Sequence, residues 1–380
     1  MTDPRLARRH DLPELVALLR DAPRVAVDTE FHAESRYVPR LYLVQLRTDA
    51  GPTWVVDPLD RALLEGLAEP LRAVPTWVVH GGTQDLRLLE RALGGVAARV
   101  HDTQVAAGLV TPVFPDGLDR LAATWLEVEV DKGPRMADWS VRPLPAEQLA
   151  YAALDVAWLL PLWDLLAARA EGLGRRDALE AACAEARAES TAPEGGAADW
   201  QRIVGEGRLD AEGVRVARRL LDWREAEACR RDRPTFFVLG DAVIRHLAKA
   251  RPTTLDALAA HRRVSDKVVD RHGDELIGVI RAALGAPDDG ARAIEPGSAE
   301  AQRLAFLELV AAVEGAAHAL APRLVAPSAR LRELALDPSP ALVADVLGPW
   351  RDALLGGALR DALSGRLALA LDGGLPTARR

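Results

Sequence analysis

Short apolar runs alternate with amphipathic segments along the first 170 residues of the chain. Runs that are partly β-branched or aromatic predict strands near residues 24–28, 41–46, 53–57, 76–80 and 99–101. Leucines at helical spacing predict helices near residues 12–21, 60–73 and 84–94, with Asp11 placed to cap the first. The short connection between the second and third strands favours antiparallel pairing, and the later strand–helix alternation favours parallel strands. The pattern therefore predicts an α/β domain with a mixed sheet, and the continuous apolar character of the strand at 24–28 suits a central position in it.

The strand signals stop after about residue 170, and Ala- and Leu-rich helical patterns follow. Stretches rich in Gly, Pro and small residues near 189–197 and 286–297 are typical of connectors. We expect an α/β domain, a helical or flexible connector and two all-α regions, at residues 1–170, 171–208, 209–287 and 297–372. A generic helical cap is the alternative for the last region.

Carboxylates stand at the ends of the predicted elements. Asp28 and Glu30 end an apolar strand at i and i+2, so both side chains project from one face. Asp85 lies in the first turn of a helix, and Asp155 follows Tyr151 by four residues, which places the phenol and the carboxylate on one helix face. If these acids meet in the fold, a hard divalent cation is the expected way to hold their charge together. Each residue alone also has a structural alternative. Asp28 could cap a loop, Asp85 could simply favour a helix N-terminus, and Tyr151 could be a half-buried core residue.

These motifs follow in the order D-x-E, H-x4-D and Y-x3-D, and they resemble the tyrosine-bearing branch of the DEDD exonuclease superfamily. Further segments resemble the ribonuclease D family in particular, at residues 37–41, 43–46, 101–104, 131–139 and 142–144. The resemblance implies a ribonuclease H-like exonuclease domain and a 3′–5′ exoribonuclease activity that releases nucleoside 5′-monophosphates.

The helical regions carry a second resemblance. Segments 220–224, 233–234, 237–241 and 272–276 have spacings that resemble an HRDC domain, a small helical module found on such nucleases. Residues 326–330 and 350–351 look like a weaker second copy. The resemblance implies modules that position structured RNA.

The residue types suggest how the chemistry would proceed. Two divalent cations, Mg²⁺ or Mn²⁺, suit all-oxygen ligands and can serve an in-line phosphoryl displacement. The expected ligands are Asp28, which would bridge both ions, with Glu30, Asp85 and Asp155. Tyr151 is expected to orient the attacking water.

Four further residues are weaker candidates for contacts with RNA. Phe31 and Tyr37 are candidates to stack on the terminal bases, with core packing as the alternative for Phe31. Lys132 and Arg135 are candidates to contact phosphate, with solvated surface charge as the alternative. His80 is expected to satisfy a buried hydrogen bond rather than to bind metal.

The net charge of −8 is unusual for a nucleic-acid-binding protein, because phosphate contacts come from Lys and Arg. The charge is unevenly distributed, however. Residues 201–287 carry 17 Lys and Arg against 13 Asp and Glu, a net of +4. The first all-α region is therefore a mildly basic module within an acidic chain.

Composition indicates an intracellular location. The two cysteines, Cys183 and Cys229, are too few for a disulfide framework and are expected to be reduced. The N-terminus has no signal-peptide pattern, and no run approaches the roughly 18 apolar residues of a membrane span. We expect a cytoplasmic protein with no membrane association and no obligatory protein partner.

The family role implied is trimming the 3′ ends of tRNA precursors and other structured small RNAs. A DNA repair exonuclease is the first alternative, because the same four acids serve such enzymes. A non-catalytic nucleic-acid-binding scaffold is the second. Such a scaffold would be expected to have lost an acid or the tyrosine, and all five residues are present.

Overall fold

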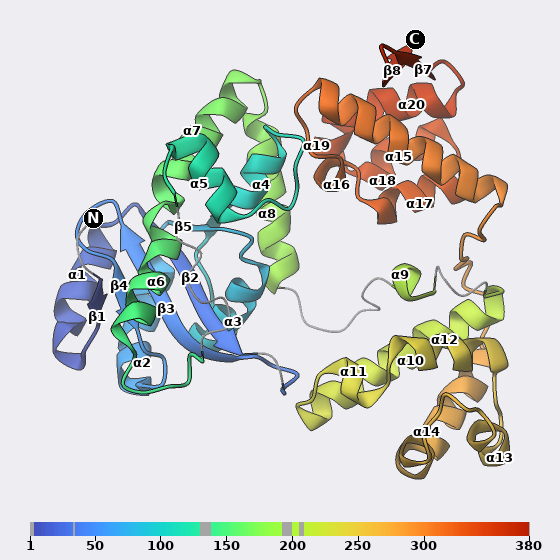
Figure 1. Cartoon of the computed structure of the whole chain (residues 1–380). Coiled ribbons are helices and arrows are strands. Elements are labelled where there is room, and N and C mark those ends of the chain that lie inside the picture. The colour runs from blue at the N-terminus through green and yellow to red at the C-terminus, as the bar shows by residue number, and fades with distance from the viewer. Residues whose placement is uncertain (1–3, 33–34, 130–137, 192–199, 205–208, 380) are drawn as a thin grey trace.

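The computed structural model describes residues 4–32, 35–129, 138–191, 200–204 and 209–379 (Figure 1). A six-stranded sheet in the order β1-β4-β3-β2-β5-β6 forms the first domain. Its strands are β1 (Arg5–Leu6), β2 (Arg24–His32), β3 (Arg40–Thr48), β4 (Trp54–Val56), β5 (Thr76–Val79) and β6 (Arg99–Asp102). β2 pairs antiparallel with β3 and parallel with β5, so the predicted mixed sheet and its central strand are confirmed. The short edge strand β1, parallel to β4, was not predicted.

Helices cover the sheet: α1 (Leu12–Asp21), α2 (Arg61–Ala73), α3 (Thr83–Leu93), α4 (Thr103–Gly108), α5 (Leu118–Leu126), α6 (Ala146–Ala157), α7 (Leu159–Gly172) and α8 (Arg176–Thr191). Successive strand residues face opposite sides. Val25 and Val27 of β2 therefore pack with α1, α2 and α3, whereas Ala26 packs in a second core with α7. The strand is thus anchored on both faces up to the residue before Asp28.

Asp11 stands at the N-cap position of α1, as predicted, but its side chain does not cap the helix. Asp11 precedes α1, but its carboxylate accepts the backbone N–H of Arg8 at 2.9 Å rather than one from the first turn of α1. Asp60 does cap α2, since its carboxylate accepts the N–H of Leu63 at 3.3 Å.

The stretch Ala146–Gly172, which contains α6 and α7, is long and apolar enough to cross a membrane, with a mean hydropathy of 1.5 over 18 residues. The expectation that no apolar segment is long enough to span a membrane is therefore wrong as far as length and composition go. Half of this window is buried inside the protein, and α7 contributes Leu159, Leu162 and Leu166 to the core. Core helices pass the same test, so the stretch is weak evidence for a membrane span.

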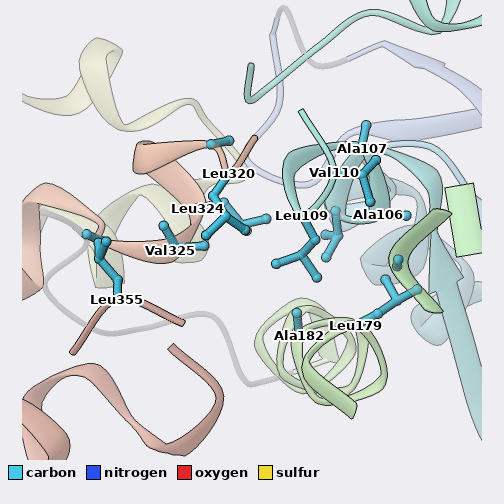
Figure 2. Packing of buried hydrophobic residues seen from close by; sticks show 14 of the residues in the cluster. Ala106, Ala107, Leu109, Val110, Leu179, Ala182, Leu320, Leu324, Val325 and Leu355 are labelled. Carbon is cyan, nitrogen blue, oxygen red and sulfur yellow. The ribbon is translucent and has the colours of Figure 1, made fainter. Parts of the chain in front are cut away.

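The C-terminal helices share a core with the first domain (Figure 2). They are α15 (Ala299–Ala317), α16 (Pro322–Val325), α17 (Ser328–Leu336), α18 (Val343–Leu347), α19 (Pro349–Arg351) and α20 (Gly357–Leu363), followed by the hairpin of β7 (Ala368–Asp372) and β8 (Leu375–Arg379). Leu320 and Leu324 meet the α4 region, and the N–H of Ala321 donates to the carbonyl of Gly108 at 2.8 Å. Helix α8, within the predicted connector, packs on α3 and β6 and supplies Leu179 to this core.

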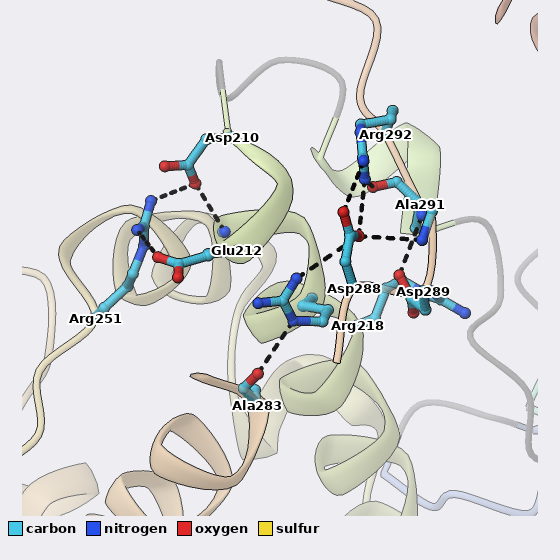
Figure 3. A network of polar contacts seen from close by, with 12 residues as sticks. Asp210, Glu212, Arg218, Arg251, Ala283, Asp288, Asp289, Ala291 and Arg292 are labelled. Atoms are coloured by element: carbon cyan, nitrogen blue, oxygen red, sulfur yellow. Dashed lines mark hydrogen bonds and ion pairs between the residues drawn. The ribbon is translucent and has the colours of Figure 1, made fainter. Parts of the chain in front are cut away.

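The middle helices form a separate core. They are α9 (Trp200–Val204), α10 (Ala211–Arg231), α11 (Thr235–Val238), α12 (Asp241–Ala250), α13 (Leu255–Ala259) and α14 (Asp266–Gly285). Ion pairs join their ends (Figure 3): Arg251 pairs with Asp210 and with Glu212, the latter at 2.7 Å, and Arg218 pairs with Asp289. Residues 209–287 were predicted as one all-α domain, and α10 to α14 lie within that range.

Candidate active site

Three carboxylates from two elements meet beside the end of β2. Asp28 and Glu30 alternate with Val27 and therefore face α6, which packs on β2 and β3. Asp155 projects from α6 toward the same place. A carboxylate oxygen from each of the three lies within 4.8 Å of the other two, and all three residues are half-buried. The i, i+2 spacing on the strand thus presents a pair of acids to a third.

Asp85 joins this group from the opposite side of the strand. It lies in the first turn of α3, as predicted, and α3 packs on the face of the sheet that Val25 and Val27 share. The buried Thr29 faces this side, and its hydroxyl donates a hydrogen bond to Asp85 Oδ1. Asp85 is consequently not one of the three acids whose ligand atoms are mutually within 4.8 Å.

Burial raises the pKa of all four acids, and the charges of the neighbouring carboxylates add to this effect at Asp28 and Glu30. Loss of solvent, followed by the charges of Asp85, Asp155 and Glu30, raises the pKa of Asp28 well above its usual value. Burial, with the charges of Asp155 and Asp85, raises the pKa of Glu30 to about 8. Burial raises the pKa of Asp155 to about 7 and also raises that of Asp85. Without a cation the site therefore holds protons near neutral pH.

The turn before α3 is fixed by a buried carboxylate. Asp102, at the end of β6, accepts the N–H groups of Gly81 at 2.9 Å and Gly82 at 3.1 Å. A Cβ on Gly82 would lie 2.7 Å from Val79 Cγ2, so the turn has no room for a side chain. Asp102 also caps α4 by accepting the N–H of Gln104 at 2.8 Å. The Asp102 side chain thereby fixes the start of α3 and so the position of Asp85 in its first turn.

His80 has two partners within the protein, as expected. Its Nδ1 lies 2.9 Å from Thr103 Oγ1, and its Nε2 lies 3.0 Å from the carbonyl oxygen of Asp116. Burial lowers the pKa of His80, which favours the neutral ring. The residue supports the β5 end and the following loop.

Tyr151 precedes Asp155 by one helical turn and is backed by an aromatic residue. The ring of Trp139 stacks on that of Tyr151 with centroids 6.2 Å apart, and Trp139 is buried. The backbone N–H of Trp139 donates to His32 Nε2 at 3.0 Å, and Arg142 donates to the carbonyl oxygen of Trp139 at 2.7 Å. The segment around Trp139 therefore restricts where the tyrosine ring can move.

The donor set suits a divalent metal. Three carboxylates that share one half-buried space supply only oxygen ligands, which hard cations such as Mg²⁺ and Mn²⁺ prefer. Their raised pKa values show that negative charge is unfavourable there without a counter-ion. A bound cation would remove that penalty.

Comparison with known proteins identifies the family. Residues 7–171 match the model of a 3′-5′ exonuclease family, and residues 214–280 match that of the HRDC domain. The ribonuclease D of Gluconacetobacter diazotrophicus is 35% identical over 373 residues, covering 96% of this chain and 93% of that protein. The chain belongs to the ribonuclease D family. The ribonuclease D of Acidiphilium cryptum is 34% identical and covers 92% of this chain and 90% of its own length.

A solved relative shows the same fold. The crystal structure of Escherichia coli RNase D, described as an exoribonuclease involved in structured RNA processing, aligns with a TM-score of 0.74 at 24% identity and covers 96% of this chain and 99% of that one. The protein is thus a 3′–5′ exoribonuclease with an exonuclease domain and an HRDC domain, formed by α10 to α14. The divalent metal that the exonuclease family implies fits the acidic group.

The four residues predicted to contact RNA have different surroundings. Phe31 is half-buried at the end of β2 and is not among the members of the apolar clusters formed by the described residues. The hydroxyl of Tyr37 donates to Glu225 Oε1 of the HRDC domain at 2.5 Å. Lys132 and Arg135 lie outside the described residues. Stacking and phosphate contacts by these four residues stay predictions.

Several residues around the site were given no role from the sequence. Thr29 was unassigned because strand alternation points it away from Asp28 and Glu30. His32 and Trp139 act through contacts between segments 107 residues apart. Only the family-like segment 131–139 indicated that Trp139 matters.

The metal-free protein should lose stability as pH rises. Glu30 and Asp155 bind protons more tightly in the folded chain than in the unfolded one, so the free energy of unfolding should fall between about pH 4 and pH 8. Each unit by which a pKa is raised corresponds to about 1.4 kcal/mol. Thermal unfolding in chelator at pH 5.5 and 8.0 measures the fall.

A matched pair of variants isolates the site from other titrating groups. Asp155→Asn should reduce the fall in melting temperature, because it removes one ionising group and one repulsive charge. Asp274→Asn, on an exposed part of α14, should leave the fall unchanged. Identical pH dependence in wild type and Asp155→Asn would contradict the raised pKa values.

Proposed function

We propose that Asp28, Glu30, Asp85 and Asp155 hold two divalent cations, Mg²⁺ or Mn²⁺, at which RNA is shortened from its 3′ end with release of nucleoside 5′-monophosphates. The observation that carries the proposal is the convergence of carboxylates from β2 and α6, with Asp85 of α3 beside them. When bound, paired cations would activate a water and stabilise the departing 3′ oxygen.

The chain's own residues would orient the reactants. The hydroxyl of Tyr151 shares a helix face with Asp155, so it can hydrogen-bond a water held beside that carboxylate. Trp139 behind the ring limits its motion. Phe31 follows Glu30 at a β-bulge and would stack on the terminal base.

The HRDC domain supplies a second RNA contact in this proposal. A cleft of about 670 Å³ lies between the end of α10, α11 and the start of α14. Arg233, Lys267 and Arg271 line it, are exposed, and form no ion pair with another described residue. Phe237 also lines the cleft, and its ring lies 4.0 Å from that of Phe236, both being at least 60% exposed. Cations beside exposed aromatic rings suit phosphates and unstacked bases.

A substrate that uses both sites has a body that reaches the HRDC cleft and a free 3′ end that reaches the carboxylates. Precursors of tRNA and other structured small RNAs have this form, and we propose them as the substrates. The involvement of the E. coli relative in structured RNA processing supports the same class. We propose the cytoplasm as the place of action.

A 5′-labelled single-stranded RNA and its DNA counterpart, each with a free or blocked 3′ end, test the activity. With Mg²⁺ or Mn²⁺ we expect a ladder that shortens from the free 3′ end of RNA, and none in chelator. Asp155→Asn should abolish it, and Tyr151→Phe should slow turnover roughly 100-fold with KM little changed. Faster digestion of DNA would identify a repair exonuclease instead, and absence of cleavage would indicate a binding scaffold.

The cleft is tested by point substitution, because residues 307–367 share the core of the exonuclease domain and deleting them would expose it. The double variant Lys267→Ala and Arg271→Ala should raise KM for a structured RNA about tenfold. It should also reduce the slope of log binding constant against log salt concentration by roughly one for each lost phosphate contact. A short single strand should be cleaved as before. Lys249→Ala, an exposed cation of α12 outside the cleft, is the control. An equal loss on both substrates would contradict a separate binding cleft.

A further inference from the structure

The exonuclease and HRDC domains touch through a small polar contact. The hydroxyl of Tyr37 donates to Glu225 Oε1 at 2.5 Å. The backbone N–H of Val38 donates to Asp232 Oδ1 at 3.3 Å, and Arg36 Nε lies 3.2 Å from Asp232 Oδ2. Residues 36–38 belong to the connection between β2 and β3, whereas Glu225 and Asp232 lie on α10 and at its end.

The contact differs in kind from the attachment of the C-terminal helices. Those helices share an apolar core with the first domain, reinforced by Arg351 and Arg330 around Glu185 of α8. The HRDC core, in contrast, contains described residues from 200–293 only. In Figure 1 the helices α10 to α14 stand apart from the sheet, and the tip of the β2–β3 hairpin approaches them. Because the contact is small, polar and partly exposed, no apolar core reinforces it, and a single substitution can release it.

The residues on each side of the contact are close in sequence to one of the two proposed RNA sites. On one side, residues 36–38 follow the strand that carries Asp28 and Glu30. On the other side, Asp232 stands between Arg231 and Arg233, which both line the basic cleft. The three residues are consecutive, so the position of Asp232 fixes one edge of the cleft.

We propose that Arg36, Tyr37 and Val38 form a latch with Glu225 and Asp232 that holds the HRDC cleft at a set position relative to the catalytic carboxylates. RNA bound in the cleft then has its 3′ end close to the carboxylates of β2, because the two domains are already held in the required orientation. Tyr37 is in this account a positioning residue, acting through its hydroxyl. The proposal rests on the proposed function, in which one RNA engages both sites.

The latch predicts a loss that depends on the length of the substrate. Tyr37→Phe removes the donated hydrogen bond but keeps the ring, and Asp232→Asn removes the charge while keeping an acceptor for Val38. Each should lower kcat/KM for a structured RNA that reaches both sites by about five- to tenfold, the size expected from one lost hydrogen bond. Cleavage of an RNA too short to reach the cleft should be unchanged. Asp222→Asn, an exposed acid on the same helix, is the control.

A double-mutant cycle separates the latch from base stacking. If the Tyr37 hydroxyl acts through Glu225, then Tyr37→Phe combined with Glu225→Ala should cost no more than either change alone. Stacking by Tyr37 would instead leave Tyr37→Phe active on both RNAs. Equal losses on long and short RNA would place Tyr37 in catalysis. Either result would overturn the latch.

Small-angle X-ray scattering of the full chain tests the latch without activity. Both Tyr37→Phe and Asp232→Asn should broaden the distribution of interatomic distances relative to wild type and Asp222→Asn. An unchanged distribution in both variants would overturn the proposal. A wild-type chain inactive on every RNA would refute the proposed function, while scattering would still decide whether the latch exists.

Discussion

The loss of solvent around a group of neighbouring carboxylates is the constraint on which this structure depends. The central strand delivers Asp28 and Glu30, and α6 delivers Asp155, into one group whose oxygens lie within 4.8 Å. Burial then favours the protonated acids and raises the pKa of Glu30 to about 8. The fold tolerates this arrangement because Val25, Ala26 and Val27 anchor the preceding residues on both faces of the sheet. A divalent cation held by Asp28, Glu30 and Asp155 would offset this unfavourable charge.

The two helical regions are attached in different ways, and each way suits a different role. The C-terminal helices meet α4 and α8 through leucines and alanines, so they complete the core of the exonuclease domain. The HRDC domain has its own core and touches the exonuclease domain through Tyr37 and Asp232. The shared core fixes the C-terminal helices to the exonuclease domain, whereas the polar contact is the latch that we propose sets the position of the HRDC cleft.

Local patterns predicted much of the fold and of the acidic site. Spacing of i, i+2 on β2 and of i, i+4 on α6 depends only on neighbouring residues, and it correctly paired Asp28 with Glu30 and Tyr151 with Asp155 on common faces. Contacts between distant segments were not predictable in this way. The hydrogen bond of Tyr37 joins residues 188 positions apart, and that of Thr29 to Asp85 joins residues 56 positions apart. Helix α8 likewise resembled a connector because its packing partners lie in α3 and β6.

Calorimetric titration with Mn²⁺ in two buffers of different ionisation enthalpy tests the central claim most directly. Near pH 7 the carboxyl groups of Glu30 and Asp155, with pKa values of about 8 and about 7, hold protons that a cation must displace. The account predicts an apparent binding enthalpy that depends on the buffer, a dependence that shrinks at pH 9 and in Asp155→Asn. Binding with the same enthalpy in both buffers at pH 7 would contradict it.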